Sequence, residues 1–302
     1  MNYLTLYFQN FIKNKDIRLF KNKKSYFLLF RILRKFFNQD LTVDIYNFKV
    51  FASYKKNKTS HALLKKCDFD DKTELLLIEN ISKKKNIFLL DCGSNYGFYS
   101  LYTAKLKFQN KVVAVEASKK TTELLQNNII LNNLNNISVY NNALSDTDNQ
   151  KVIFNESFND WESSLSHQDF KLSNQENIDT KKIDTIIEEN KPSIDQILVI
   201  KMDIEGNEFK ALRGAYMTIE TYEPIIIIEF SRFIFNEEKS KEFLSYFLKK
   251  FDYKIYNIKN VNISENEIFE SISLLDEQHD TIGNYYLVKN NSTKLNFLKN
   301  YD

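Results

Sequence analysis

One segment carries most of the information about the architecture of this chain: Phe88-Leu89-Leu90-Asp91-Cys92-Gly93-Ser94-Asn95-Tyr96-Gly97-Phe98-Tyr99-Ser100. It is an apolar strand that ends on a carboxylate, passes through two glycines and enters a helical pattern. The chain has only 5 Gly in 302 residues, so two of them in one turn indicate a backbone requirement. Glycine accepts positive φ and lets the backbone approach a ligand, and the following helix presents N–H groups to the turn. We therefore predict a strand-turn-helix unit that holds a nucleotide-like ligand.

A second apolar strand, Lys111–Glu116, also ends on an acid, 25 residues after Asp91. An acid at this place usually binds the hydroxyls of a ribose, both in NAD-binding and in S-adenosylmethionine-binding folds. The sequence of the glycine turn distinguishes between NAD and S-adenosylmethionine. A dinucleotide fingerprint reads G-x-G-x-x-G, whereas this turn reads Gly93-x-x-x-Gly97 with Asp91 before it. S-adenosylmethionine has an ammonium group, a positive sulfur and no phosphate, so a carboxylate beside the turn favours it over NAD.

Composition predicts an ordered chain, since 43% of the residues are hydrophobic. The net charge of +2 is unevenly spread: residues 1–60 hold 13 Lys and Arg against 3 Asp and Glu, and the remainder holds 29 against 37. The two cysteines do not form a disulfide framework, no apolar run approaches the ~20 residues of a membrane span, and the first ten residues do not resemble a signal peptide. We therefore expect a cytoplasmic protein.

Residues 1–38 have a helical pattern of aromatic and basic residues. Two interpretations stay open: the helix docks its aromatic face on the main domain, or it rests on an anionic membrane surface or a polyanionic substrate. Nucleic acid is not an expected partner, because no base-reading motif is present. With a β-hairpin over 41–56, this extension forms residues 1–58, before a ligand-binding domain over 59–292 and a tail over 293–302.

The rest of the chain alternates strand and helix patterns. Near-continuous apolar strands favour an α/β fold with a mostly parallel sheet, helices on both faces, and an antiparallel pair formed by its last two strands. The strands are expected at 87–91, 111–116, 137–141, 196–202, 224–229, 253–258 and 284–289. The helices are expected at 73–80, 97–107, 121–132, 183–189, 209–220 and 237–250. An extra strand is expected at 151–155, followed by a polar loop over 156–177.

Acids follow two further strands. Asp203, Glu205 and Glu208 come after strand 196–202, and Glu229 ends the next strand. Carboxyl ends of parallel strands share one edge of the sheet, where ligands bind, so the strand-end acids predict one shared site. Alternatively, Glu205 and Glu208 individually cap a helix N-terminus.

The order Leu-Asp-Cys-Gly-Ser-Asn-Tyr-Gly, Val-Glu-Ala, Leu-Asn-Asn, Asn-Ala-Leu-Ser-Asp, Ile-Lys-Met-Asp-Ile-Glu-Gly-Asn-Glu and Ile-Ile-Glu resembles the FkbM family of S-adenosylmethionine-dependent methyltransferases, over about residues 60–232. The resemblance implies a seven-stranded class I methyltransferase (Rossmann-like) sheet and O-methylation, often of sugars. It also implies cofactor contacts from the turn, from Glu116 to the ribose, and from the adenine-side loop. The residues so implied are Asp91, Gly93, Ser94, Asn95, Gly97, Glu116, Asn142, Ala143 and Asp146. Cys92 and Tyr96 depart from the small or aliphatic residues usual in this turn.

Methylation of an alcohol requires a group that takes up the hydroxyl proton. We expect Asp203 in this role, as general base or metal ligand, with Glu205 in support. Asp203 and Glu229 would be the ligands of a Mg²⁺ ion; alternatively, Glu229 pairs with Arg232 or Lys201. The loop that contains Trp161 and His167 would border the acceptor pocket.

The resulting hypothesis is an O-methyltransferase that acts on a hydroxyl of a sugar, a glycan or a related natural product. Two rivals remain: an NAD-dependent sugar-modifying enzyme, and a non-catalytic relative that recruits glycan enzymes to a membrane.

Overall fold

The computed structural model describes residues 41–52, 72–157, 172–236, 239–259, 261–275 and 281–298. The chain divides into two units, residues 1–70 and 71–302. The described part of the first unit is the predicted hairpin, with strands β1 (Leu41–Ile45) and β2 (Phe48–Ala52) paired antiparallel. The predicted helix over 1–38, the domain boundary at 58–59 and the loop with Trp161 and His167 lie outside the described residues.

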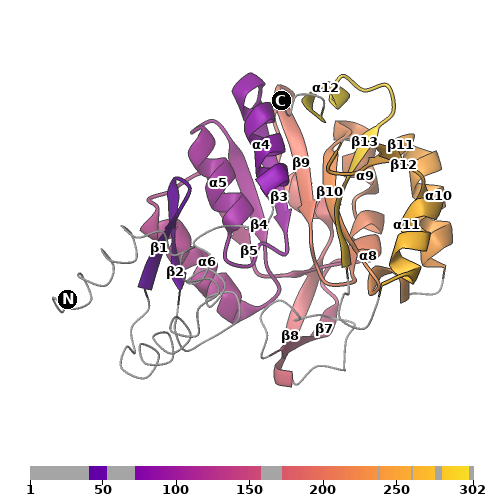
Figure 1. Ribbon diagram of the computed structural model, residues 1–302. Helices are drawn as coiled ribbons and strands as arrows, with labels where there is room; N and C mark the ends of the chain where they lie inside the picture. The colour runs from indigo at the N-terminus through magenta and orange to yellow at the C-terminus, as the bar shows by residue number, and fades with distance from the viewer. Residues whose placement is uncertain are drawn as a thin grey trace, which may run out of the picture. The chain divides into compact units, whose positions relative to one another are not determined.

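The second unit is built on an eight-stranded sheet with the order β12-β11-β13-β10-β9-β3-β4-β5 (Figure 1). Strands β5, β4, β3, β9 and β10 are parallel, and β13 is antiparallel to both of its neighbours, β10 and β11. The strands are β3 (Asn86–Cys92), β4 (Lys111–Val115), β5 (Ile137–Tyr140), β9 (Gln196–Met202), β10 (Ile225–Ser231), β11 (Tyr253–Tyr256), β12 (Asn262–Ile263) and β13 (Thr281–Lys289). The mostly parallel α/β sheet is confirmed, and the two-residue β12 adds a strand to the seven expected.

Successive residues of a strand point to opposite faces of the sheet. Both faces are apolar here, and helices cover both of them. Leu90 and Cys92 of β3 belong to a core shared with residues of the helices that follow β8 and β9, whereas Asp91 between them contacts Ser100 of α5 on the other face. The helices are α4 (Lys72–Lys84), α5 (Phe98–Leu106), α6 (Lys119–Leu131), α7 (Ile183–Asn190), α8 (Glu208–Arg213), α9 (Tyr216–Tyr222), α10 (Ser240–Phe251), α11 (Glu265–Ser273) and α12 (Leu295–Leu298).

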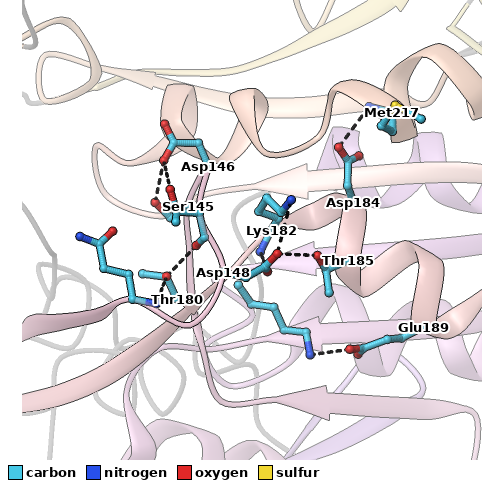
Figure 2. A network of polar contacts seen from close by, with 12 residues as sticks. Ser145, Asp146, Asp148, Thr180, Lys182, Asp184, Thr185, Glu189 and Met217 are labelled. Atoms are coloured by element: carbon cyan, nitrogen blue, oxygen red, sulfur yellow. Dashed lines mark hydrogen bonds and ion pairs between the residues drawn. The ribbon is translucent and has the colours of Figure 1, made fainter.

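The single helix expected over 209–220 is two helices, α8 and α9, separated at Gly214. A Cβ at Gly214 would overlap the carbonyl oxygen of Ser145, so only glycine fits against that backbone. Asp184 of α7 holds the start of α9: it accepts a hydrogen bond from the backbone N–H of Met217 at 3.1 Å (Figure 2). It also accepts from the N–H and the hydroxyl of Thr218, both at 2.7 Å. Packing against a neighbouring backbone therefore overrides the helical pattern.

A second, three-stranded sheet has the order β6-β8-β7 and lies at the lower edge of the view in Figure 1. Its strands are β6 (Ala143–Leu144), β7 (Lys151–Ser157) and β8 (Leu172–Lys181). The extra strand predicted at 151–155 is confirmed, but the polar loop predicted over 156–177 is wrong at both ends. Residues 172–177 pair antiparallel with β7 although their sequence is polar. The backbone hydrogen bonds between β7 and β8 form this two-stranded ribbon, although residues 172–177 contain no apolar run that would predict a strand.

The C-terminal strands differ from the expected consecutive pair. β11 and β13 do pair antiparallel, but β12 and α11 intervene, and β13 lies inside the sheet between β10 and β11. The predicted tail begins as α12, which contacts α4, and buries Leu298. Its Lys294 Nζ donates to the backbone carbonyls of Tyr222 (2.7 Å) and Glu223 (2.6 Å) at the end of α9. A cation at a helix C-terminus is favourable.

Among the described helices, none has the length and apolar character needed to span a membrane. Peripheral contact through residues 1–38 stays a prediction.

Candidate active site at the carboxyl edge of the sheet

The glycine turn after β3 is fastened to the end of β4. The N–H groups of Gly93 and Ser94 both donate to the carbonyl oxygen of Val115, at 2.9 and 3.0 Å. Gly93 has a φ of +76°, and a Cβ there would overlap the backbone carbonyl of Asp203 in the turn after β9. The N–H of Asp203 in turn donates to the carbonyl of Cys92 at 3.1 Å. The turns after β3 and β9 are thus in direct backbone contact.

The second glycine has a similar requirement. Gly97, with a φ of +86°, is the N-cap of α5, and a Cβ there would overlap the side chain of Leu125 in α6. Both glycines therefore stand where a side chain has no room and where L-residues are strained. The expectation that the backbone requires these two glycines is borne out; their contact with a cofactor stays a prediction.

Asp91 is hydrogen-bonded to the helix that follows the turn. Its Oδ2 accepts hydrogen bonds from the N–H (3.1 Å) and the hydroxyl (2.5 Å) of Ser100. Burial raises the pKa of Asp91 to about 6, although the bonds to Ser100 and the charge of Lys201 lower it in part. Asp91 therefore holds the first turn of α5 in place, beside the predicted ligand site.

Glu116 lies directly after β4 and is joined to the glycine turn. Its Oε2 accepts from the N–H of Asn95 and its Oε1 from the N–H of Ser118, both at 2.9 Å. Burial raises the pKa of Glu116 to about 7, and these amides lower it in part. Asn95 has a positive φ of 48°, and its Oδ1 is buried without a hydrogen-bond partner among the described residues. A buried acceptor of this kind is rare unless a ligand or solvent satisfies it.

The residues predicted for the adenine side lie at the join of the two sheets. Asn142 Nδ2 donates to the carbonyl of Asp179 in β8 at 3.0 Å, and Ala143 is buried in β6. Asp146 accepts from Ser145 Oγ at 3.4 Å (Figure 2) and from Thr147 Oγ1 at 3.2 Å. Its Oδ2 lies 3.4 Å from Arg213 Nε. The side chains of Asn142 and Asp146 thus serve the join itself. Asn141 is the one that reaches back, donating to the carbonyl of Glu116 at 2.9 Å.

Asp203 and Glu205 occupy the turn between β9 and α8. The side chain of Asp203 is 40% exposed, and its Oδ2 lies 3.5 Å from Lys201 Nζ. Glu205 is half-buried in the left-handed region, with a φ of 53°. Glu208 accepts hydrogen bonds from the N–H groups of Ile204 and Gly206, both at 2.9 Å. These amides precede α8, so Glu208 ties the loop to the start of the helix, and its role as a helix cap stays a prediction. Burial raises the pKa of Glu208 to about 7.

Glu229 is half-buried in β10, next to β13, where Asn284 is its register partner. Burial and then the charge of Asp203 raise the pKa of Glu229 to about 8, and Lys201 lowers it in part. The strand-end acids Asp91, Asp203 and Glu229 are therefore close enough to interact electrostatically. Pairing of Glu229 with Arg232 or Lys201 stays a prediction.

The predicted Mg²⁺ site does not fit this arrangement. A lysine ammonium already stands beside Asp203, where a second cation would be repelled. Within the described residues, no three His, Cys, Asp or Glu side chains are grouped so that they could hold a metal ion. We derive no step through a metal.

Tyr99 and Asn284 contact Lys201 but were not predicted as part of the site, and Lys201 was considered only as a possible partner of Glu229. The available signal was the lysine itself, since Ile197–Met202 is otherwise an apolar strand buried on both faces. A charge in such a strand requires a partner.

The chain is similar in sequence to known methyltransferases. The methyltransferase FkbM domain matches residues 91–255, beginning on Asp91. "Methyltransferase 1" of Beauveria bassiana (strain ARSEF 2860) is 24% identical over 144 residues, which is 42% of this chain and 57% of that protein. The chain thus spans little more than half the length of this relative.

The solved structures to which this chain is similar include two methyltransferases. The methyltransferase FkbM of Methylobacillus flagellatus KT is 22% identical, with 67% of this chain and 43% of that chain covered and a TM-score of 0.41. An O-methyltransferase of Bacillus cereus, solved with SAH, is 16% identical over 74% of this chain and 83% of that chain, also with a TM-score of 0.41. Because the family match covers more than half of its residues, the chain belongs to the methyltransferase FkbM domain family.

Proposed function

We propose that this chain is an S-adenosylmethionine-dependent methyltransferase that methylates a hydroxyl group of a sugar, a glycan or a related natural product. Family membership supports the reaction class. The observation that carries the proposal is the buried Oδ1 of Asn95 in the glycine turn, which has no hydrogen-bond partner among the described residues and lies beside the Glu116 carboxylate that accepts the Asn95 N–H. The donor would lie over this turn, and the acceptor would meet it at the Asp203 turn, which is in backbone contact with the glycine turn.

The donor end suits S-adenosylmethionine, which supplies a methyl group on a sulfonium when bound. Glu116 accepts from the backbone amides of Asn95 and Ser118, and the amide of Ala117 also lowers its pKa, so a carboxylate with about four acceptor sites keeps some capacity for ribose hydroxyls. The buried Oδ1 of Asn95 would accept a hydrogen bond from the donor's ammonium group.

The start of α5 argues against NAD. A pyrophosphate binds to the backbone amides at a helix N-terminus. Here the Asp91 carboxylate accepts a hydrogen bond from the Ser100 amide in the first turn of α5. A pyrophosphate would compete with this buried negative charge, whereas a cationic ligand would not.

At the acceptor end, Asp203 is the carboxylate best placed to take up a hydroxyl proton, because its side chain is 40% exposed. Glu229, with a pKa of about 8, is mostly protonated at pH 7 and therefore a poor base there. Glu205 stands two residues further along the same turn and would support substrate binding.

Calorimetry with S-adenosylhomocysteine and with NADH tests the donor. We expect the first to bind and the second not to bind, and Glu116→Gln to weaken binding about tenfold through the ribose. Glu188→Gln, an exposed change on α7, is the control. Binding of NADH alone would support the rival dehydrogenase, and binding of neither would remove the enzymatic interpretation.

The same protein is then assayed for S-adenosylhomocysteine formation on a panel of sugars and glycans. For an accepted sugar, Asp203→Asn should lower kcat by about 10²–10⁴-fold while donor binding persists, because general-base catalysis is worth about that much. Donor binding without turnover on any acceptor would favour the non-catalytic relative.

A further inference from the structure

The buried Lys201 lies among the strand-end acids Asp91, Asp203 and Glu229 at the carboxyl edge of the sheet. In register, Lys201 pairs with Asp91 of β3 on one side and with Ile227 of β10 on the other. Side chains in one cross-strand row point to the same face, and so do those two positions further along each strand. Lys201 therefore lies on the same face of the sheet as Asp91. Glu229 lies on this face too, two residues after Ile227 and so nearer the carboxyl ends of the strands. Asp203 is the first residue after β9.

The ammonium group of Lys201 is held from three directions. Nζ donates to Asn284 Oδ1 at 3.1 Å, lies 3.5 Å from Asp203 Oδ2, and stands over the ring of Tyr99, 5.4 Å from the centroid. Its side chain is 2% exposed, against 40% for Asp203. These partners come from β13, the β9–α8 turn and α5. Burying an ammonium is costly unless such partners compensate it.

The charge of Lys201 acts on more than one carboxylate. It lowers the pKa of Asp91 and of Glu229, in both cases against the larger effect of burial. Three strand-end carboxylates, Asp91, Asp203 and Glu229, thus share one internal cation.

We propose that Lys201 is a positioning residue that supplies, from β9 itself, the positive charge that orients Asp203 at the acceptor site and keeps divalent metals out of it. The inference rests on the proposed function in assigning this edge to the acceptor. The charge compensation itself can be measured without any acceptor.

The experiment compares the full-length protein with Lys201→Met and Lys201→Arg, using Mn²⁺ as the probe and electron paramagnetic resonance as the readout. Lys254→Met, an exposed strand position in β11, controls for the change in net charge. Calorimetry with S-adenosylhomocysteine shows separately that each variant is folded and that the donor site exists.

We expect no bound Mn²⁺ at about 1 mM in the wild type, Lys201→Arg or Lys254→Met, since each keeps an internal cation. Lys201→Met should bind Mn²⁺ at least about tenfold more tightly, because Asp203 then lacks its ammonium partner and Glu229 releases its proton when a metal takes that place. Asp203→Asn in the Lys201→Met background should abolish the new signal.

Two results would overturn the proposal: wild-type Mn²⁺ binding that Asp203→Asn removes, or a folded Lys201→Met that binds no Mn²⁺. If Lys201→Met does not fold, the wild type still decides, because Mg²⁺ must then leave its Tm unchanged relative to a chelator. A Mg²⁺-dependent rise in Tm that Asp203→Asn abolishes would contradict the role of Lys201. Failure to bind S-adenosylhomocysteine would refute the proposed function alone.

Discussion

The strand-end carboxylates of this domain are satisfied in different ways, and this decides which of them can meet a ligand. Asp91 is occupied by Ser100, and Glu208 by the loop amides before α8. Glu116 accepts hydrogen bonds from Asn95 and Ser118 but can accept more. Asp203 forms an ion pair with Lys201, yet its side chain is 40% exposed and can reach a ligand. The sequence predicted that these acids share one edge. It could not predict their partners, because partners depend on side-chain rotamers from distant elements.

Gly93 offers a test at the scale of one residue. Gly93→Ala should lower the free energy of unfolding by about 2–4 kcal/mol, combining left-handed strain with a clash against the Asp203 carbonyl. It should also abolish binding of S-adenosylhomocysteine. Gly283→Ala is the matched control, because Gly283 has a φ of +93° and no atom within 4 Å of its ideal Cβ. Its cost should be only about 1–2 kcal/mol, from strain alone. Equal urea-unfolding results for the two variants would show that the backbone contact is unimportant.

At the scale of elements, strands were easier to predict than their surroundings. β9 was predicted at both ends, since an apolar run in a parallel sheet has a clear beginning and end. The break between α8 and α9 was missed because it depends on the approach of Ser145 to Gly214, which no local pattern encodes. β8 was missed because its pairing with β7 uses backbone groups and polar residues.

Asp184 tests how α9 is held. Asp184→Ala should lower the free energy of unfolding by about 1–2 kcal/mol, because the α9 N-terminus loses its hydrogen-bond acceptor. Glu188→Ala on the exposed side of the same helix should change it by less than about 0.5 kcal/mol. Urea unfolding of both variants provides the measurement, and similar losses would contradict the capping role.

At the scale of the whole domain, several carboxyl groups have pKa values raised by burial: Asp91 to about 6, Glu116 and Glu208 to about 7, and Glu229 to about 8. Each binds its proton more tightly in the folded than in the unfolded state. Each group therefore adds to the free energy of unfolding. This contribution is present in full below the pKa of about 4 that the group has in the unfolded chain, and it is lost as pH rises through the pKa of the folded state. The ligand-free domain should be less stable at pH 8.5 than at pH 6.

Glu229→Gln removes one of these titrations. Between pH 6 and 8.5 the wild type should lose about 1–2 kcal/mol more than Glu229→Gln, since ionising Glu229 beside Asp203 is unfavourable. Urea unfolding at both pH values measures the difference. Glu265→Gln, in the first turn of α11, is the control. Parallel pH profiles for wild type and Glu229→Gln would show that Glu229 ionises at its ordinary pKa.

The position of β13 between β10 and β11 has a consequence for synthesis on the ribosome. β10 and β11 leave the exit tunnel well before Thr281–Lys289, yet they touch only through that late strand. Until it emerges, one side of β10 displays unpaired amides and carbonyls that invite association with other nascent chains. The sheet of the nascent domain therefore stays open at β10 until Thr281–Lys289 has emerged.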